Sequence, residues 1–205
     1  MTAETPLGKA LMQESGTTKV IDSDSVFKKY NFSSLITQAD VQNACDTIKS
    51  IIDSGNYWEN SPKYQTKENI FARPEEFWLK FRMSFLFSVF MYLGREAKVS
   101  NMQAWSFMTR LSDAEDRNKL WHHHQHKPSP ISYSGIWYLH IPEDVENRDF
   151  CGTEIAPNGP EGDGKFFVKP TEFSWLIYPS SYWHRPGVPQ SDKYRYIIAA
   201  DVEVH

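Results

Sequence analysis

A cluster of histidines is the part of this sequence best suited to chemistry. Four of the seven histidines lie in the run WHHHQH, at His122, His123, His124 and His126. They lead into a segment rich in Ile, Tyr and Trp, which is typical of a β-strand. Because side chains two apart on a strand point to the same face, His122, His124 and His126 would share one face. Two imidazoles on one face can reach one metal ion, and His184 in YPSSYWHRPG is the best candidate for a third ligand.

The number of ligands indicates the kind of metal site. Structural zinc sites are closed by four protein ligands, whereas catalytic sites keep a coordination position open. A His-x-His pair on a strand, with a later histidine, can build a mononuclear site inside a β-barrel. The sequence offers three good ligands, which favours a catalytic site.

The histidines also belong to an ordered series of segments in the second half of the chain. A strand is predicted at Ser134–Leu139, followed by the glycine-containing turn Cys151–Glu154 and by Pro179–His184. Arg195 follows His184 by eleven residues, in the run Tyr-Arg-Tyr-Ile-Ile.

This series resembles the Fe(II)- and 2-oxoglutarate-dependent oxygenases, in particular small phage and bacterial members related to prolyl-hydroxylase-type enzymes. In that family a His-x-Asp or His-x-His pair and a proline precede a Ser-Gly-Val-Tyr-Tyr-like strand. A Gly-rich turn, a Phe-Pro-Ser…His segment and an arginine then follow in order. The matching residues here are His124-Gln125-His126 with Pro128, Ser134-Gly135-Ile136-Trp137-Tyr138-Leu139, Cys151-Gly152-Thr153-Glu154, Tyr178-Pro179-Ser180 with His184, and Arg195. The resemblance covers about the last hundred residues of the chain.

The resemblance implies which residues hold the metal. His124, His126 and His184 would bind Fe(II) and leave positions open for 2-oxoglutarate and O₂. Most of these oxygenases use two histidines and one carboxylate, so a histidine at position 126 makes the site one unit more positive. Three-histidine iron sites occur in other barrel dioxygenases. His122 with His124 is an equally spaced alternative pair, and Glu154 is the nearest carboxylate that could replace a missing one.

The resemblance also implies how the cosubstrate is held. Arg195 would bind the distal carboxylate of 2-oxoglutarate, because a guanidinium pairs with a carboxylate in a bidentate fork and keeps its charge. Tyr138 would donate its hydroxyl to the same carboxylate, and Ser134 could assist from the same strand face. Arg185 is the alternative cation, although it directly follows His184 and would point away from the metal face.

The elements that position these residues change in character along the chain. After an N-terminal arm at residues 1–35, helical periodicity begins at Thr37 and ends at Gly55, and a second helix is predicted from Pro74 to Gly94. Short β-type runs follow, at 103–109, 132–141, 165–168, 172–178 and 194–204. We therefore expect one domain of α+β, mainly β class. Residues 36–95 would be a helical support packed outside the sheet, and residues 100–205 a double-stranded β-helix core of jelly-roll, cupin-like type.

Composition limits the environment and the partners. The chain has 205 residues and a net charge of -4, so nothing in its overall charge points to nucleic acid or an anionic membrane. Cys45 and Cys151 lie far apart and are expected to be free thiols in a reducing compartment. No export signal or transmembrane span is apparent, which favours a cytoplasmic protein. Neither the oligomeric state nor the small-molecule or peptidyl substrate follows from the sequence.

The sequence is consistent with three functions. The first is a 2-oxoglutarate-dependent dioxygenase, a hydroxylase that releases succinate and CO₂. The second is a three-histidine cupin dioxygenase, which has no need of Arg195 for a cosubstrate. The third is a non-catalytic jelly-roll module for metal binding or assembly, whose histidines hold a structural ion or none.

Overall fold

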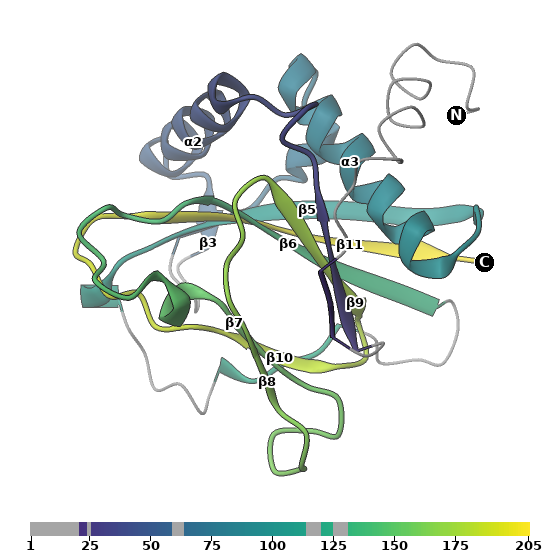
Figure 1. Cartoon of the computed structure of the whole chain (residues 1–205). Coiled ribbons are helices and arrows are strands. Elements are labelled where there is room, and N and C mark those ends of the chain that lie inside the picture. The colour runs from purple at the N-terminus through teal and green to yellow at the C-terminus, as the bar shows by residue number, and fades with distance from the viewer. Residues whose placement is uncertain (1–20, 24–25, 59–63, 114–119, 125–130) are drawn as a thin grey trace.

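The computed structural model describes residues 21–23, 26–58, 64–113, 120–124 and 131–205 (Figure 1). Most of the regular structure in these ranges is β-sheet, with two α-helices, α2 (Gln38–Asp53) and α3 (Glu76–Leu93). Every strand pairing in these ranges is antiparallel. The predicted α+β, mainly β class is confirmed.

The strands form two sheets. In the described part of the chain the larger sheet has eight strands, in the order β1-β2-β9-β6-β11-β5-β4-β3, and the smaller has the order β10-β7-β8. The strands of the larger sheet are β1 (Ile21–Ser23), β2 (Phe27–Asn31), β3 (Tyr57–Trp58), β4 (Gln65–Thr66), β5 (Val99–Thr109), β6 (Ile131–His140), β9 (Ser174–Pro179) and β11 (Arg195–Val204). Those of the smaller sheet are β7 (Thr153–Ala156), β8 (Phe166–Val168) and β10 (Trp183–Pro186). Short 3₁₀ turns are η1 (Ile70–Ala72), η2 (Leu111–Asp113) and η4 (Arg148–Cys151).

The two faces of the larger sheet are covered by different layers. Helices α2 and α3 cover one face, and the smaller sheet lies against the other (Figure 1). On β6, Trp137 points to the helices and packs with Phe81 and Trp175, whereas Tyr138 points into the space between the sheets, where Ile155 also lies. Because both faces are covered, the interior residues of β6 are all buried, including the polar Ser132 and Ser134.

The helix boundaries follow the predicted signals. The Thr37 hydroxyl accepts from the Asp40 backbone N–H at 3.2 Å, and the Asp40 carboxylate accepts from the Thr37 N–H at 2.8 Å, which forms a capping box at the start of α2. Helix α3 ends at Gly94, whose φ of 69° places it in the left-handed region that closes helices. The Lys80 ammonium lies 3.0 Å from the Asp40 carboxylate and ties α3 to α2.

Helix α3 lies directly on the centre of the larger sheet. A Cβ atom at Gly135 of β6 would lie 2.5 Å from the Phe85 ring of α3, so only glycine permits this approach. The close packing holds β6 and, through its pairing, β9 and β11 in place.

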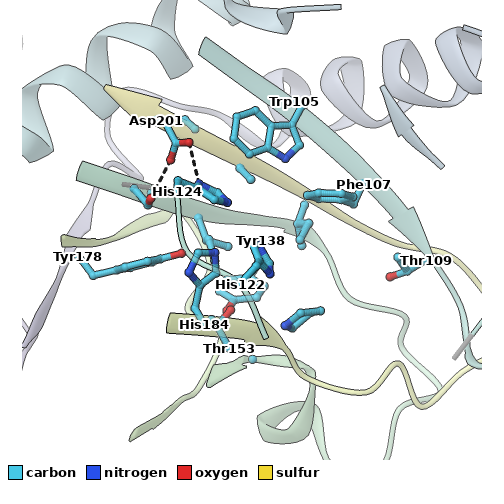
Figure 2. Close-up of a pocket in the computed structure, with 18 of the residues that line it drawn as sticks. Trp105, Phe107, Thr109, His122, His124, Tyr138, Thr153, Tyr178, His184 and Asp201 are labelled. Carbon is cyan, nitrogen blue, oxygen red and sulfur yellow. Dashed lines mark hydrogen bonds and ion pairs between the residues drawn. The ribbon is translucent and has the colours of Figure 1, made fainter. Parts of the chain in front are cut away.

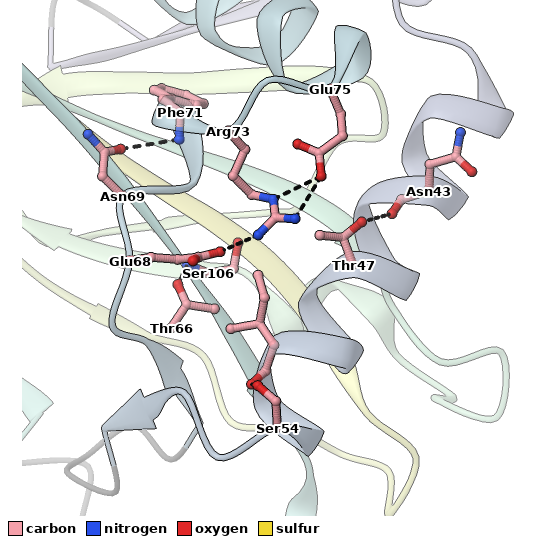
Figure 3. A network of polar contacts seen from close by, with 11 residues as sticks. Asn43, Thr47, Ser54, Thr66, Glu68, Asn69, Phe71, Arg73, Glu75 and Ser106 are labelled. Carbon is pink, nitrogen blue, oxygen red and sulfur yellow. Dashed lines mark hydrogen bonds and ion pairs between the residues drawn. The ribbon is translucent and has the colours of Figure 1, made fainter.

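A polar network fixes the segment between β4 and α3 to strand β5 (Figure 3). Arg73 pairs with Glu68 at 2.6 Å and with Glu75 at 2.7 Å. The Asn69 side-chain oxygen accepts from the backbone N–H of Phe71 at 3.2 Å and of Ala104 at 2.9 Å. Strand β5, which carries aromatic residues of the site described below, is thereby held from outside the sheet.

The structure departs from the prediction in the histidine run. His122 forms only an isolated antiparallel bridge with His184, and His124 lies in a bend, so the strand expected there is wrong. Strands β5, β6, β8, β9 and β11 agree with the expected runs. Strands β1 and β2 lie in the segment expected to be an N-terminal arm, and β3, β4, β7 and β10 lie outside the expected runs. No helix in the described ranges combines the length and the apolar character that a bilayer span requires.

Candidate metal centre

Three imidazoles converge at one end of the space between the sheets. His122, His124 and His184 each offer a ligand atom, and these atoms all lie within 4.8 Å of one another (Figure 2). The ring centroids of His122 and His184 are 4.3 Å apart, and those of His124 and His184 are 4.9 Å apart. His184 is buried and His122 is exposed, so the cluster has one side toward the protein and one toward solvent.

Backbone hydrogen bonds bring the three histidines together. His122 and His184 exchange two bonds across their bridge, of 3.1 Å from the His122 N–H and 2.9 Å from the His184 N–H. The His124 N–H donates to the Ser180 carbonyl at 2.9 Å. The histidine run is therefore anchored to the segment that carries β10, and the ligand geometry rests on main-chain contacts.

The second ring nitrogens are engaged in a way that suits metal binding. Nδ1 of His122 lies 2.7 Å from the Leu120 carbonyl, and Nδ1 of His184 lies 3.1 Å from the Tyr182 carbonyl. Because a carbonyl only accepts, both Nδ1 atoms carry the proton, and each Nε2 keeps a free lone pair. Metal-binding histidines commonly have this arrangement, with the outer nitrogen bonded to a carbonyl or carboxylate.

The pKa values of two of these histidines also fit a metal ion. Burial, together with the nearby His122 and His124 rings, holds the pKa of His184 well below its usual value. Part of His122 reaches solvent, but the loss of water around its ring likewise lowers its pKa. Neutral imidazole is the form that binds metals, and three imidazoles suit zinc, iron and copper ions. The residues present therefore fit a divalent transition metal.

A carboxylate stands behind the third histidine. Asp201 Oδ2 lies 2.7 Å from Nδ1 of His124, and Asp201 Oδ1 lies 2.7 Å from the Ser134 hydroxyl (Figure 2). The sequence reasoning gave Asp201 no role. Its position in the sequence could have pointed to it. Asp201 is six residues after Arg195 on the same strand, β11, so the two side chains lie on the same strand face.

A buried arginine lines the same cavity. Arg195 is 2 % exposed and donates from one terminal nitrogen to the carbonyls of Cys151 at 2.9 Å and Gly187 at 3.2 Å, and from Nε to the Thr109 hydroxyl at 3.3 Å. Among the described residues, no carboxylate lies within ion-pair distance of Arg195. Burial lowers the pKa of Arg195, but its guanidinium stays charged at neutral pH. A buried cation in a cavity without an acidic partner is suited to an anionic ligand.

Tyr138 and Thr153 add hydroxyls to the cavity wall. The Tyr138 hydroxyl lies 2.6 Å from Thr153 Oγ1, and burial raises the pKa of Tyr138 to about 12, so the phenol remains a hydrogen-bond donor. Apolar side chains complete the lining, namely Trp105, Phe107, Ile136, Tyr178 and Ile197.

The predicted site residues can now be placed. Of the predicted ligands, the structure brings together His124 and His184, joined by His122, the alternative left open by the sequence, whereas His126 lies outside the described residues. Arg195, Tyr138 and Ser134 all line the same cavity as these histidines. The Ser134 hydroxyl is directed to Asp201, at the histidine end. Arg185, the alternative cation, pairs with Glu154 and lies over the Trp121 ring at 4.4 Å.

Comparison with known proteins supports the fold. No protein-family profile matches the sequence, and no curated protein matches it. Among solved structures, AviO1 from Streptomyces viridochromogenes Tue57 superposes with a TM-score of 0.60 at 11% identity, covering 98% of this chain and 96% of that one. A prolyl-4-hydroxylase from Pseudomonas putida gives 0.59 at 8% identity, covering 96% and 98%. A prolyl hydroxylase from Trichoplax adhaerens, in complex with a hypoxia inducible factor peptide fragment, gives 0.56 at 12% identity, covering 96% and 88%. The chain therefore has the fold of the prolyl hydroxylases, and the resemblance predicted from the sequence is confirmed for the fold.

Proposed function

We propose that this chain is an Fe(II)- and 2-oxoglutarate-dependent dioxygenase, acting as a hydroxylase. We take its two sheets as the halves of a double-stranded β-helix in a single domain, by analogy with the similar structures. The observation that carries the proposal is Arg195, a buried cation that lacks a carboxylate partner among the described residues and lines the cavity of the three histidines.

His122, His124 and His184 would hold the iron, with His126 as the alternative member suggested by the sequence. When bound, the iron supplies the activation of O₂ that is coupled to oxidative decarboxylation of 2-oxoglutarate. The protein orients the reactants and limits the access of water, for which the apolar wall formed by Trp105, Phe107 and Ile197 is suited.

Arg195 would hold the distal carboxylate of 2-oxoglutarate, and the Tyr138 and Thr109 hydroxyls would support it. Guanidinium and carboxylate match in shape and charge, and the pair is stronger in a buried site than in water. Thr109 already receives a hydrogen bond from Arg195 Nε, so the guanidinium plane is set before the ligand arrives.

The substrate would be a small molecule or a peptidyl side chain. Cys45 and Cys151 are both free and buried, which supports the proposal that the protein works in a reducing, cytoplasmic compartment.

The proposal is tested by anaerobic titration with Fe(II) and 2-oxoglutarate, following the visible charge-transfer band of the chelated cosubstrate. We expect a band that needs both components and is lost in Arg195→Ala. Arg148→Ala is the matched control, because Arg148 pairs with Glu172 on the surface, and it should keep the band. Arg185→Ala should also keep it.

A second titration avoids any change to the protein. The acid 2-oxopentanoate has the 2-oxo acid group and chain length of 2-oxoglutarate but lacks its distal carboxylate. We expect the unmodified protein to bind it at least about tenfold more weakly, since a charged hydrogen bond contributes about 1.5–3 kcal/mol. Equal binding of the two acids would contradict the role of Arg195.

The three-histidine ligand set itself favours a second candidate, a cupin-type dioxygenase that does not use 2-oxoglutarate. Iron binding without the charge-transfer band would support that candidate. Failure to bind iron would contradict both.

A further inference from the structure

The carboxylate of Asp201 differs from the other groups around the histidine cluster. Its side chain is 13% exposed, and among the described residues no lysine or arginine lies within ion-pair distance of it. A largely buried carboxylate needs a positive partner or several hydrogen bonds. The adjacent group that can become positive in character is the His124 ring, once its other nitrogen binds a metal.

A chain of hydrogen bonds holds Asp201 in this position. The Ser134 hydroxyl lies 2.7 Å from Asp201 Oδ1 and 2.9 Å from the Ser180 hydroxyl. Because a carboxylate only accepts, Ser134 donates to Asp201 and accepts from Ser180. The Ser180 carbonyl in turn accepts from the His124 N–H. The same residues therefore fix the His124 main chain and the carboxylate behind its ring.

His124 is the one clustered histidine whose outer nitrogen faces a charge. His122 and His184 direct Nδ1 to backbone carbonyls, whereas Nδ1 of His124 lies 2.7 Å from Asp201. The contact is short, but its geometry is not that of a hydrogen bond, and Nδ1 of His124 has no hydrogen-bond partner among the described residues.

We propose that Asp201 is a positioning residue that supplies, through His124, the negative charge that a three-histidine metal site otherwise lacks. Two histidines and a carboxylate give a divalent ion one unit of negative charge in direct contact. Here three imidazoles would bind the ion, and the same unit of negative charge lies on Asp201, on the far side of the His124 ring. The proposal rests on a metal at the three histidines, as in the proposed function, and not on the use of 2-oxoglutarate.

The first test measures metal affinity in Asp201→Asn, which removes the charge and keeps the side-chain shape. We expect the affinity for Co(II) and Zn(II), measured by competition with a chelator, to fall about 10- to 100-fold, as is usual when a group behind a ligand is removed. Glu203→Gln is the matched control, because Glu203 lies two residues further along β11, and it should bind metal as the unmodified protein does. Unchanged affinity in Asp201→Asn would overturn the proposal.

The second test asks whether Asp201 acts through His124 or binds the ion itself. If it acts through the ring, Asp201→Asn should cause no further loss of affinity when His124 is already alanine. An equal loss in both backgrounds would assign Asp201 as a direct ligand and overturn the positioning role.

Nuclear magnetic resonance can distinguish a positioning role of Asp201 from a purely structural one, because it reports on each histidine ring separately. In the zinc-loaded protein, long-range ¹H–¹⁵N spectra should show a downfield Nδ1–H for His124 that shifts in Asp201→Asn, while the signals of His122 and His184 stay in place. Shifts of all three rings would show a general distortion and contradict the proposal. These measurements use no cosubstrate, so they can succeed where the 2-oxoglutarate titration fails, and the two proposals are separable.

Discussion

His122 and His126 compete for one place in the metal site, because each is two residues from His124. The structure places His122 in the cluster through its main-chain bridge to His184. We expect His122→Ala to lose most of the Fe(II) or Co(II) affinity and His126→Ala to keep it, as measured by chelator competition. If His126→Ala lost the affinity and His122→Ala kept it, the pair predicted from the family resemblance, His124 and His126, would be correct.

At the level of the residue, the sequence identified side chains that the structure brings to one cavity where the residue type restricts the chemistry, and it missed a residue whose contact is long-range. Histidine and arginine are chemically distinctive, and His124, His184 and Arg195 were selected because they fall in an ordered series of segments that resembles a known family. Asp201 did not, since aspartate is common on surfaces and its partner His124 lies far away in the sequence. Only the pairing of β11 beside β6 shows that Asp201 and Ser134 are opposite one another.

Helix α2 provides a test at the level of the element. Burial alone would raise the pKa of Asp40, but the hydrogen bonds from Thr37 and Lys80 outweigh it and hold the pKa below its usual value. The stabilisation is therefore present above the unfolded-state pKa of about 3.9 and is lost as the pH falls through the lower folded-state pKa.

We expect Asp40→Asn to reduce the free energy of unfolding by about 1 kcal/mol at pH 7, the usual contribution of a helix cap. The difference from the unmodified protein should shrink toward zero under strongly acidic conditions, where Asp40 is protonated in both states. Urea unfolding at several pH values measures this. Asp46→Asn, on the exposed side of α2, is the control and should show little change at any pH.

Helices and strands were predicted best where they are long and where local sequence signals mark their ends. The capping residues Thr37 and Asp40 and the closing Gly94 are local, so both helices were predicted near their observed ends. Strands β7 and β10 have four residues each and include Glu154, His184 and Arg185, so no alternating apolar pattern marks them. The strand prediction for the histidine run was wrong for a related reason. One isolated bridge between His122 and His184 holds the run in place, without a continuous series of strand hydrogen bonds.

The metal centre joins elements that are distant in the sequence, so its occupation should stabilise the whole molecule. His122 and His124 precede β6, His184 is on β10, and Asp201 is on β11. An ion that binds only the folded chain adds about 2.7 kcal/mol of stability at a concentration 100 times its dissociation constant. For a chain of this size that corresponds to a rise in Tm of roughly 5–11 °C.

We therefore expect chelator-treated protein to melt at a lower temperature than protein with added Co(II), by calorimetry or circular dichroism. His184→Ala should bind no metal and show no such rise. Full metal content in that variant would remove His184 from the ligand set.

The two charges at the ends of the cavity, Arg195 and Asp201, stand on a single strand and on one face of it. Strand β11 is hydrogen-bonded on both sides, to β5 and to β6, so its length cannot adjust to a ligand. If the cavity holds a dicarboxylic 2-oxo acid, the fixed spacing along this strand determines how long the carbon chain of that acid must be. The four-carbon acid oxaloacetate would be too short to reach the guanidinium of Arg195, and a six-carbon acid would have to bend to fit. The spacing of the β11 backbone would thus decide which 2-oxo acids the protein binds.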